Sequence, residues 1–171
     1  EGTFTDGTVI ATNYNGPSKV YVDSFTNKNG GILAIEGPNY PAQDFASSPQ
    51  VIPYAEYPQV FANTADLSDG LLELRPSSDT GLYDDTFEMN DVIVANTITG
   101  ELADVYTRSI LLDVTAHQDD LYGEDQTKSD YDTIDVVINR VAFNAPKLGL
   151  NINQTSVATD IENTYTPALA G

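Results

Sequence analysis

The sequence predicts an all-β fold: a single-domain two-layer β-sandwich of about eight or nine strands with long Pro- and Asp-rich loops. Three observations lead to this prediction. Apolar and polar residues alternate with a period of two in several segments, and turn-forming residues separate these segments. Thr, Asn, Asp, Gly and Tyr are common, whereas Lys and Glu are scarce, a mixture that favours strands and turns. A jelly roll is one form that such a sandwich can take.

The first strands are expected in residues 8–12, 19–25 and 31–35. Residues 19–25 alternate, with Val20 and Val22 on one face. Residues 31–35 read GILAI, a continuous apolar run that is typical of a strand buried on both faces. The intervening NKNGG favours a hairpin turn, because Asn and Gly tolerate positive φ.

Residues 37–60 differ from the rest because prolines interrupt any regular element. Aromatic residues are interleaved with the prolines, which lie at Pro38, Pro41, Pro49, Pro53 and Pro58. Two interpretations remain open: a cover packed over a sheet, or a contact surface for another molecule.

Later strands are expected in residues 70–74, 86–99, 106–117, 134–143 and 147–153, with one helical turn in 99–106. No internal repeat or linker is evident, so residues 1–171 are expected to form one domain. The end segments 1–7 and 154–171 carry few core-forming residues. They are expected either to pack on their own domain or to pair with strands of a neighbouring subunit.

Composition excludes several classes of function. The 171 residues contain 26 acidic and 7 basic side chains, a net charge of −19, so nucleic acid and anionic membrane surfaces are poor partners. No apolar run is long enough to span a membrane, and the absence of Cys excludes disulfides and thiolate chemistry. High ionic strength, bound divalent cations or a cationic partner would relieve the repulsion.

The chain begins with Glu1 rather than Met, which favours a processed chain that is secreted or displayed at the cell surface. The sequon Asn153-Gln154-Thr155 follows a predicted strand, where an exposed turn is expected.

Catalytic motifs are absent from the sequence. His117 is the single histidine, and Ser109 or Ser129 would be its nearest candidate nucleophiles, but no G-x-S-x-G elbow occurs. The sequence also has no phosphate-binding loop, dinucleotide fingerprint or zinc-ligand spacing. We therefore expect that the protein is not an enzyme and that His117 is a surface or capping residue.

An acidic segment between residues 119 and 135 predicts a calcium site, since Ca²⁺ prefers six to eight oxygen ligands. Asp130 and Asp132 share a face with Ile134 and Val136, so both carboxylates are expected at the mouth of the sandwich. Asp135 points the other way and is a weaker candidate. The predicted ligands are Asp119, Asp120, Glu124, Asp125, Asp130 and Asp132.

Residues 123–139, GEDQTKSDYDTIDVVIN, resemble the calcium loop of the bacterial calcium-mediated lectins that bind fucose and mannose. The matching positions are Glu124, Asp125, Asp130, Tyr131, Val136, Val137, Ile138 and Asn139. The resemblance implies calcium ligands at Glu124 and Asp130, with Asp132 in place of an Asn. Lys128 and Thr133 stand where that family has Asp, so the resemblance implies one calcium ion at most and supports a calcium loop more than a sugar site.

A second acidic group is either another cation site or a solvated loop. It comprises Asp66, Asp69, Asp79, Asp84, Asp85, Glu88 and Asp91.

These features together predict a structural subunit of an extracellular assembly, such as a filament, pilus or surface layer. Strand contacts between subunits would build the homopolymer, and calcium would stabilise it. A calcium-dependent carbohydrate-binding or adhesin module with a glycan ligand is the first alternative. A viral jelly-roll shell protein is the second.

Overall fold

The computed structural model describes residues 2–5, 8–11, 19–37, 50–51, 57–75, 86–121 and 131–165. Within these residues the chain forms two β-sheets and a C-terminal helix, which confirms the prediction of a β-rich fold with two sheets. Every strand pair among β1 to β9 is parallel. Jelly rolls are built from antiparallel strands, so this part of the chain does not follow that arrangement.

The chain alternates between the two sheets. The larger sheet has the order β1-β3-β6-β8-β11-β10, and the smaller has the order β2-β4-β7-β9. Strands β1, β3, β6 and β8 of the larger sheet are each followed along the chain by a strand of the smaller sheet, and we call such a pair a coil. The coils are β1 (Gly2–Thr5) with β2 (Thr8–Ala11), β3 (Lys19–Lys28) with β4 (Ile32–Glu36), β6 (Gln59–Asp66) with β7 (Leu71–Arg75), and β8 (Thr86–Thr99) with β9 (Asp104–Thr107).

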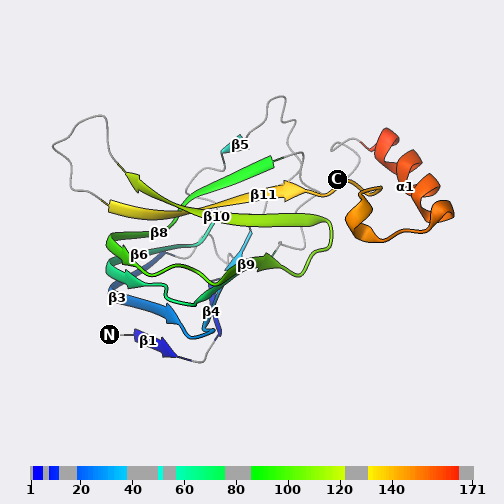
Figure 1. Ribbon diagram of the computed structural model, residues 1–171. Coiled ribbons are helices and arrows are strands. Elements are labelled where there is room, and N and C mark those ends of the chain that lie inside the picture. Colours follow the sequence, from blue (N-terminus) through cyan, green and yellow to red (C-terminus); the bar gives the residue numbers. More distant parts are fainter. Residues whose placement is uncertain are drawn as a thin grey trace.

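An antiparallel hairpin of β10 (Leu112–Leu121) and β11 (Tyr131–Arg140) follows the last coil. Strand β11 pairs with β8, and β10 runs close to β9 without pairing with it. The hairpin therefore covers one end of the stack, and β1 lies at the other end (Figure 1). The short strand β5 (Gln50–Val51) pairs with the start of β8.

The turns between the two sheets are stacked and hydrogen-bonded to one another. The Gly30 amide donates to the Asp69 carbonyl over 2.9 Å, and the Asp69 amide donates to the Glu101 carbonyl over 3.1 Å. Asn29 and Gly30 have φ angles of 54° and 77°, as expected for the NKNGG turn. The hairpin prediction for this turn is wrong, because β3 and β4 belong to different sheets and pair with other coils.

Close backbone approach at these turns requires Gly70. A Cβ atom at this position would lie 2.1 Å from the carbonyl oxygen of Asn27 in the neighbouring coil. Asn27 is itself buried, and its side-chain amide donates to the Leu71 carbonyl over 3.0 Å. Backbone contact and a buried amide therefore join these two turns.

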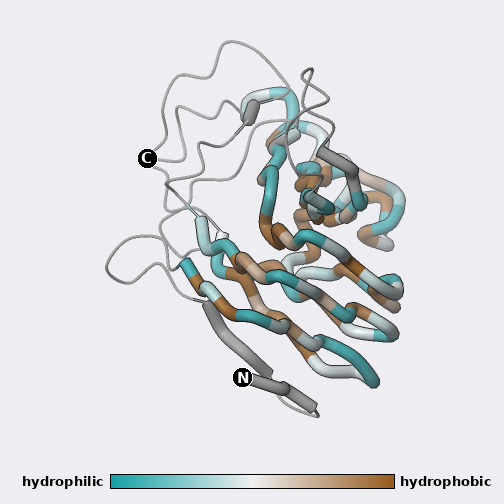
Figure 2. The backbone as a smooth tube through the Cα atoms, turned by 90° about the vertical axis from the view of Figure 1, so that its left-hand side faces the viewer, coloured by the Kyte–Doolittle hydropathy of each residue, from teal (hydrophilic) through white to brown (hydrophobic). Residues whose placement is uncertain are grey.

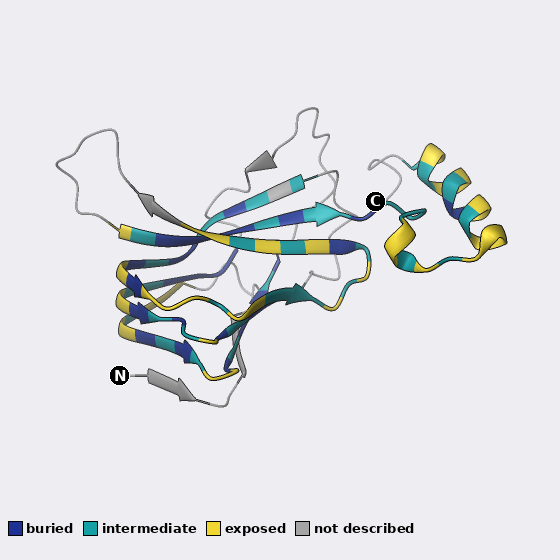
Figure 3. Ribbon diagram, viewed as in Figure 1, coloured by how far each residue is buried: buried dark blue, intermediate teal, exposed yellow. Residues whose placement is uncertain are grey.

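The hydrophobic core lies between the two sheets. Buried and less buried positions alternate at the end of β3, whereas β4, β7 and β11 carry runs of consecutive buried positions. Figure 2 shows the apolar residues, in brown, along the strands, and Figure 3 shows the buried ones in dark blue. The middle residues of β4, 33–35, are all buried, as the apolar run predicts. The core contains Phe25, Leu33, Ile35, Val60, Leu72, Leu74, Met89, Ile93, Ala95, Ile134, Val136 and Ile138.

Three predicted elements differ from the structure. Residues 147–153 form no strand: a 3₁₀ turn (Pro146–Leu148) leads to helix α1 (Ile152–Thr164), which starts with a capping box. Asn151 accepts the Gln154 amide, and the Gln154 side chain accepts the Asn151 amide. The helical turn expected in 99–106 is a turn leading into β9, and the strand expected in 106–117 is divided between β9 and β10. The sequon thus lies in the exposed first turn of α1.

Helix α1 extends beyond the end of β11, apart from the sheets (Figure 1). Ala158 is its buried residue. Both oxygens of Glu162 accept hydrogen bonds from the Arg140 guanidinium, and Oε2 also accepts the Phe143 amide over 2.9 Å. The Arg140 guanidinium lies 4.9 Å from the centre of the Tyr165 ring, so polar and cation–π contacts hold the helix.

The Pro-rich segment 37–60 is described at its two ends and in β5. Tyr57 is fully buried, and its hydroxyl donates to the Asn90 carbonyl of β8. This residue packs as the cover interpretation expects. The remaining aromatic positions between 38 and 56 lie outside the described residues.

Candidate functional site

The predicted calcium ligands lie at the tip of the β10–β11 hairpin and in the connection between its strands. Asp119 and Asp120 belong to β10, opposite Thr133 and Asp132 of β11. Glu124, Asp125 and Asp130 lie outside the described residues. The strand register therefore brings the backbones of Asp120 and Asp132 side by side, where the acidic connection begins and ends.

Asp132 is half-buried, and its carboxylate is already hydrogen-bonded to a backbone amide. Its Oδ2 accepts the Ile98 amide of β8 over 2.6 Å. It shares a face with Ile134 and Val136, as the alternation predicts. This hydrogen bond joins the start of β11 to β8, next to the acidic segment that connects β10 with β11.

A second group of metal-ligating side chains lies on the opposite face of the same hairpin. The His117 Nε2 atom is 3.9 Å from Glu88 Oε1 and 4.0 Å from Asp135 Oδ2. One ligand atom from each of these residues lies within 4.8 Å of the other two. The three residues come from β8, β10 and β11, so strand pairing gathers residues that are distant in sequence.

A β-bulge positions Asp135. The register between β8 and β11 shifts between Ile134 and Val136, so three residues of β8 lie opposite Asp135 alone. The central one, Asp91, has a φ of 58° and donates its amide to Asp135 Oδ1 over 2.7 Å. Bulges often re-aim side chains near functional sites.

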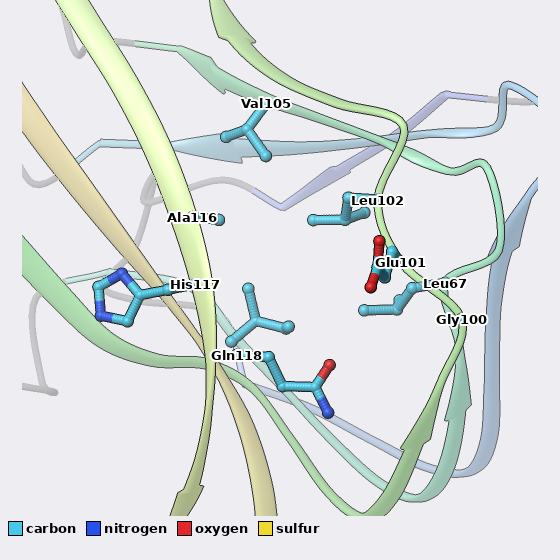
Figure 4. Close-up of a pocket in the computed structure, with 9 residues that line it drawn as sticks. Leu67, Gly100, Glu101, Leu102, Val105, Ala116, His117 and Gln118 are labelled. Atoms are coloured by element: carbon cyan, nitrogen blue, oxygen red, sulfur yellow. The ribbon is translucent and has the colours of Figure 1, made fainter.

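A pocket of about 280 Å³ opens on the core side of β10. Leu67, Leu102, Val105 and Ala116 make it largely apolar, and Gln118 adds a carboxamide. The His117 ring points to the other side of β10 (Figure 4). The pocket and the Glu88–His117–Asp135 group therefore occupy opposite faces of one strand.

Most described members of the second acidic group have structural roles. Asp66 accepts hydrogen bonds from the Ser68 hydroxyl and amide and pairs with Lys28, and these contacts lower its pKa. Asp69 adopts positive φ in a turn, and Asp91 does so at the bulge of β8. Glu88 differs because it faces His117.

Glu73 is a buried carboxylate in β7. Arg75 donates to its Oε2 over 2.8 Å, and Arg108 Nε lies 2.6 Å from its Oε1. The hydrogen bond from Arg75 is the main cause of its lowered pKa, and Coulomb attraction to both guanidinium groups adds to it. The half-buried Arg75 and the exposed Arg108 thus stabilise a buried charge on β7.

Sequence reasoning missed the Glu88–His117–Asp135 group. It treated His117 as a surface residue at a strand end, whereas β10 continues to Leu121. It ranked Asp135 low because this residue points away from the predicted calcium loop. The available signal was that His117 and Asp135 both alternate with core residues and therefore lie on outer faces.

Comparison with protein-family models, curated proteins and solved structures finds no match to this chain. In the described part of the chain, no helix has the length and apolar character to cross a membrane.

Proposed function

We propose that the chain is a structural subunit of an extracellular assembly, such as a filament, pilus or surface layer, joined by β-strand contacts and stabilised by calcium. One observation supports this most directly: the first coil supplies the outermost strand of both sheets, β1 in the larger and β2 in the smaller. Within the described residues, no strand pairs with the outer edge of β1 or of β2. Such edges are templates for strand addition.

The two ends of the coil stack differ in structure. The β10–β11 hairpin follows the last coil and presents β10 as the other edge of the larger sheet. A contact between two different edges is heterologous and extends into a filament when its rotation does not close a ring. Of the two end segments expected to pair between subunits, residues 2–5 form this edge strand, and residues 154–164 belong to α1.

Calcium fits the hairpin end of the subunit. Asp120 lies opposite Asp132 in the antiparallel register, so an acidic pair lies one residue pair before the connection that carries Glu124, Asp125 and Asp130. A divalent cation would remove the repulsion among these carboxylates. Stabilisation of the subunit by calcium follows from its binding to the folded state alone.

Sedimentation velocity over a wide concentration range tests the assembly, with electron microscopy of the concentrated protein. We expect concentration-dependent polymers, and we expect deletion of residues 1–7 to leave a monomer with an unchanged circular dichroism spectrum. A full-length chain that stays monomeric at every concentration in the presence of Ca²⁺ would rule out the proposal. The melting temperature with and without EGTA tests calcium separately, and a curve indifferent to the chelator would remove calcium from it.

A further inference from the structure

We propose that Glu88, His117 and Asp135 form a binding site for a zinc-class divalent ion on the outer face of the larger sheet. This site is distinct from the predicted calcium loop, which uses other residues, and it does not depend on assembly.

The strand register builds the site. His117 of β10 lies directly opposite Asp135 of β11. Glu88 of β8 lies opposite Val137, two residues further along β11 and on the same face as Asp135. All three side chains therefore project from one face of three adjacent strands, a rigid support for a ligand set.

The distances fit an ion better than direct contact. The His117 nitrogen is 3.9 Å from the Glu88 oxygen and 4.0 Å from the Asp135 oxygen, beyond the range of a good hydrogen bond. Ligands bound tetrahedrally to one zinc ion at about 2.1 Å lie about 3.4 Å apart. Small rotations of these side chains would bring their ligand atoms from the observed distances to that spacing.

Asp135 is held in place for this role. Its Oδ1 accepts the Asp91 amide, while Oδ2 is the oxygen nearer to His117. Its side chain is 11% exposed, so packing also fixes its position. Ligating carboxylates in metal sites are commonly oriented by such a second hydrogen bond.

Two buried oxygens without a hydrogen-bond donor lie beside the same bulge. Gln59 Oε1 and Asn90 Oδ1 are buried and have no hydrogen-bond partner among the described residues. Gln59 is 2% exposed, and its amide nitrogen donates to the carbonyl of Asp91, the residue whose amide donates to Asp135. Buried acceptors without a donor cost free energy. The bulge that positions Asp135 therefore lies next to buried acceptors that the described residues leave unsatisfied.

The donor set selects the class of metal. Imidazole nitrogen suits Zn²⁺, Cu²⁺ and Ni²⁺, whereas Ca²⁺ and Mg²⁺ prefer oxygen ligands alone. Two carboxylates and a neutral imidazole balance the charge of one divalent ion. The His117 and Glu88 side chains are 43% and 29% exposed, so the ion has a path of entry and a coordination position open to water.

Co²⁺ is a suitable probe because it absorbs visible light when a few nitrogen and oxygen ligands hold it, so its binding at this site can be followed by absorbance. The full chain, stripped with a chelator and kept in excess Ca²⁺ to fill oxygen sites, is titrated with Co²⁺ and then with Zn²⁺. We expect saturation at one Co²⁺ per chain, with a visible band that Zn²⁺ abolishes. A titration that does not saturate, or no change in the band on adding Zn²⁺, would overturn the proposal.

Variants test the ligands. We expect His117→Gln and Glu88→Gln each to weaken Zn²⁺ binding at least about 10-fold. Both side chains are partly exposed, so folding is expected to survive, and circular dichroism checks it. Asp113→Asn is the matched control, because Asp113 lies on the same face of β10 as His117 but outside the site, and its substitution removes one carboxylate charge as Glu88→Gln does. Equal Zn²⁺ affinity in His117→Gln and Asp113→Asn would show that the metal binds elsewhere.

Discussion

The coils and helix α1 are held by different forces. Between the two sheets, Leu33, Leu72 and Leu74 are almost completely inaccessible to solvent, and the turns of adjacent coils are hydrogen-bonded. Helix α1 buries Ala158 and exposes Ile152, Val157 and Ile161. Apolar burial builds the coil stack, whereas one bidentate ion pair and two aromatic rings attach the helix.

This difference predicts two units of unequal stability. The apolar core of the coils should unfold cooperatively, because each coil contacts its neighbours. The helix has few buried apolar contacts, so it should open locally at a lower free energy. The following variants either separate the two units or show that they unfold together.

Leu72→Ala has the largest expected effect. Leu72 has no exposed surface, and removing its side chain leaves a cavity between the sheets. We expect a loss of about 2–5 kcal/mol in the free energy of global unfolding, measured by urea denaturation. Val157→Ala on α1, where the side chain is 59% exposed, is the control and should change global stability little. Equal effects of the two variants would contradict the comparison.

Gly70→Ala tests the stacked turns. The new Cβ would lie 2.1 Å from the Asn27 carbonyl oxygen, so the two turns must separate. We expect a loss of about 1–3 kcal/mol in the free energy of unfolding. Gly30→Asn is a control in the same turn stack, because a Cβ there meets no atom within 4 Å and Asn tolerates positive φ. If Gly70→Ala proves as stable as Gly30→Asn, the turns are not closely packed.

Glu162→Gln tests the attachment of the helix. It removes the charge that accepts two hydrogen bonds from Arg140, so α1 should detach more often. We expect about 1–2 kcal/mol less protection from hydrogen exchange for the α1 amides. The exchange rates of the β8 amides should not change. Asp160→Asn removes an exposed charge from the same helix and should leave both regions unaltered.

Acid should weaken the same attachment, with the smallest effect. The hydrogen bonds from Arg140 hold the Glu162 pKa below its usual value of 4.5, so its ionised form stabilises the docked helix. That contribution is complete above about pH 4.5 and is lost as pH falls through the lowered pKa of the folded state. The difference in α1 exchange between wild type and Glu162→Gln should therefore shrink below pH 4.5. A constant difference at all pH values would contradict this origin.

Alternation and apolar runs located most strands. The predicted strand 86–99 coincides with β8, and the run at residues 31–35 is buried as expected. The partners of the strands were not predictable in the same way. Asn29 and Gly30 signal positive φ, but that conformation suits both a hairpin and a turn between two sheets. The coils also leave no visible repeat in the sequence, because the segments between successive coils differ in length.

Helix α1 was missed because its sequence is rich in Thr and Asn and lacks a regular apolar stripe. The capping pair Asn151 and Gln154 was the signal that could have found it. The Glu88–His117–Asp135 group depends on the pairing of β8, β10 and β11, which no single strand reveals. Period-two reasoning did place Asp132 and Asp135 on opposite faces, as the structure shows.

The alternation of the coils confines length variation to one flank of the molecule. The segments after β2, β4 and β7 each start where a strand of the smaller sheet ends and return where a strand of the larger sheet begins. Because β4 and β7 are parallel and in register, their ends at Glu36 and Arg75 lie side by side, and so do the starts of β3 and β6 at Lys19 and Gln59. Peptides inserted between successive coils would thus leave the turns at the opposite ends of these strands unaltered, which makes this flank suitable for displaying grafted sequences.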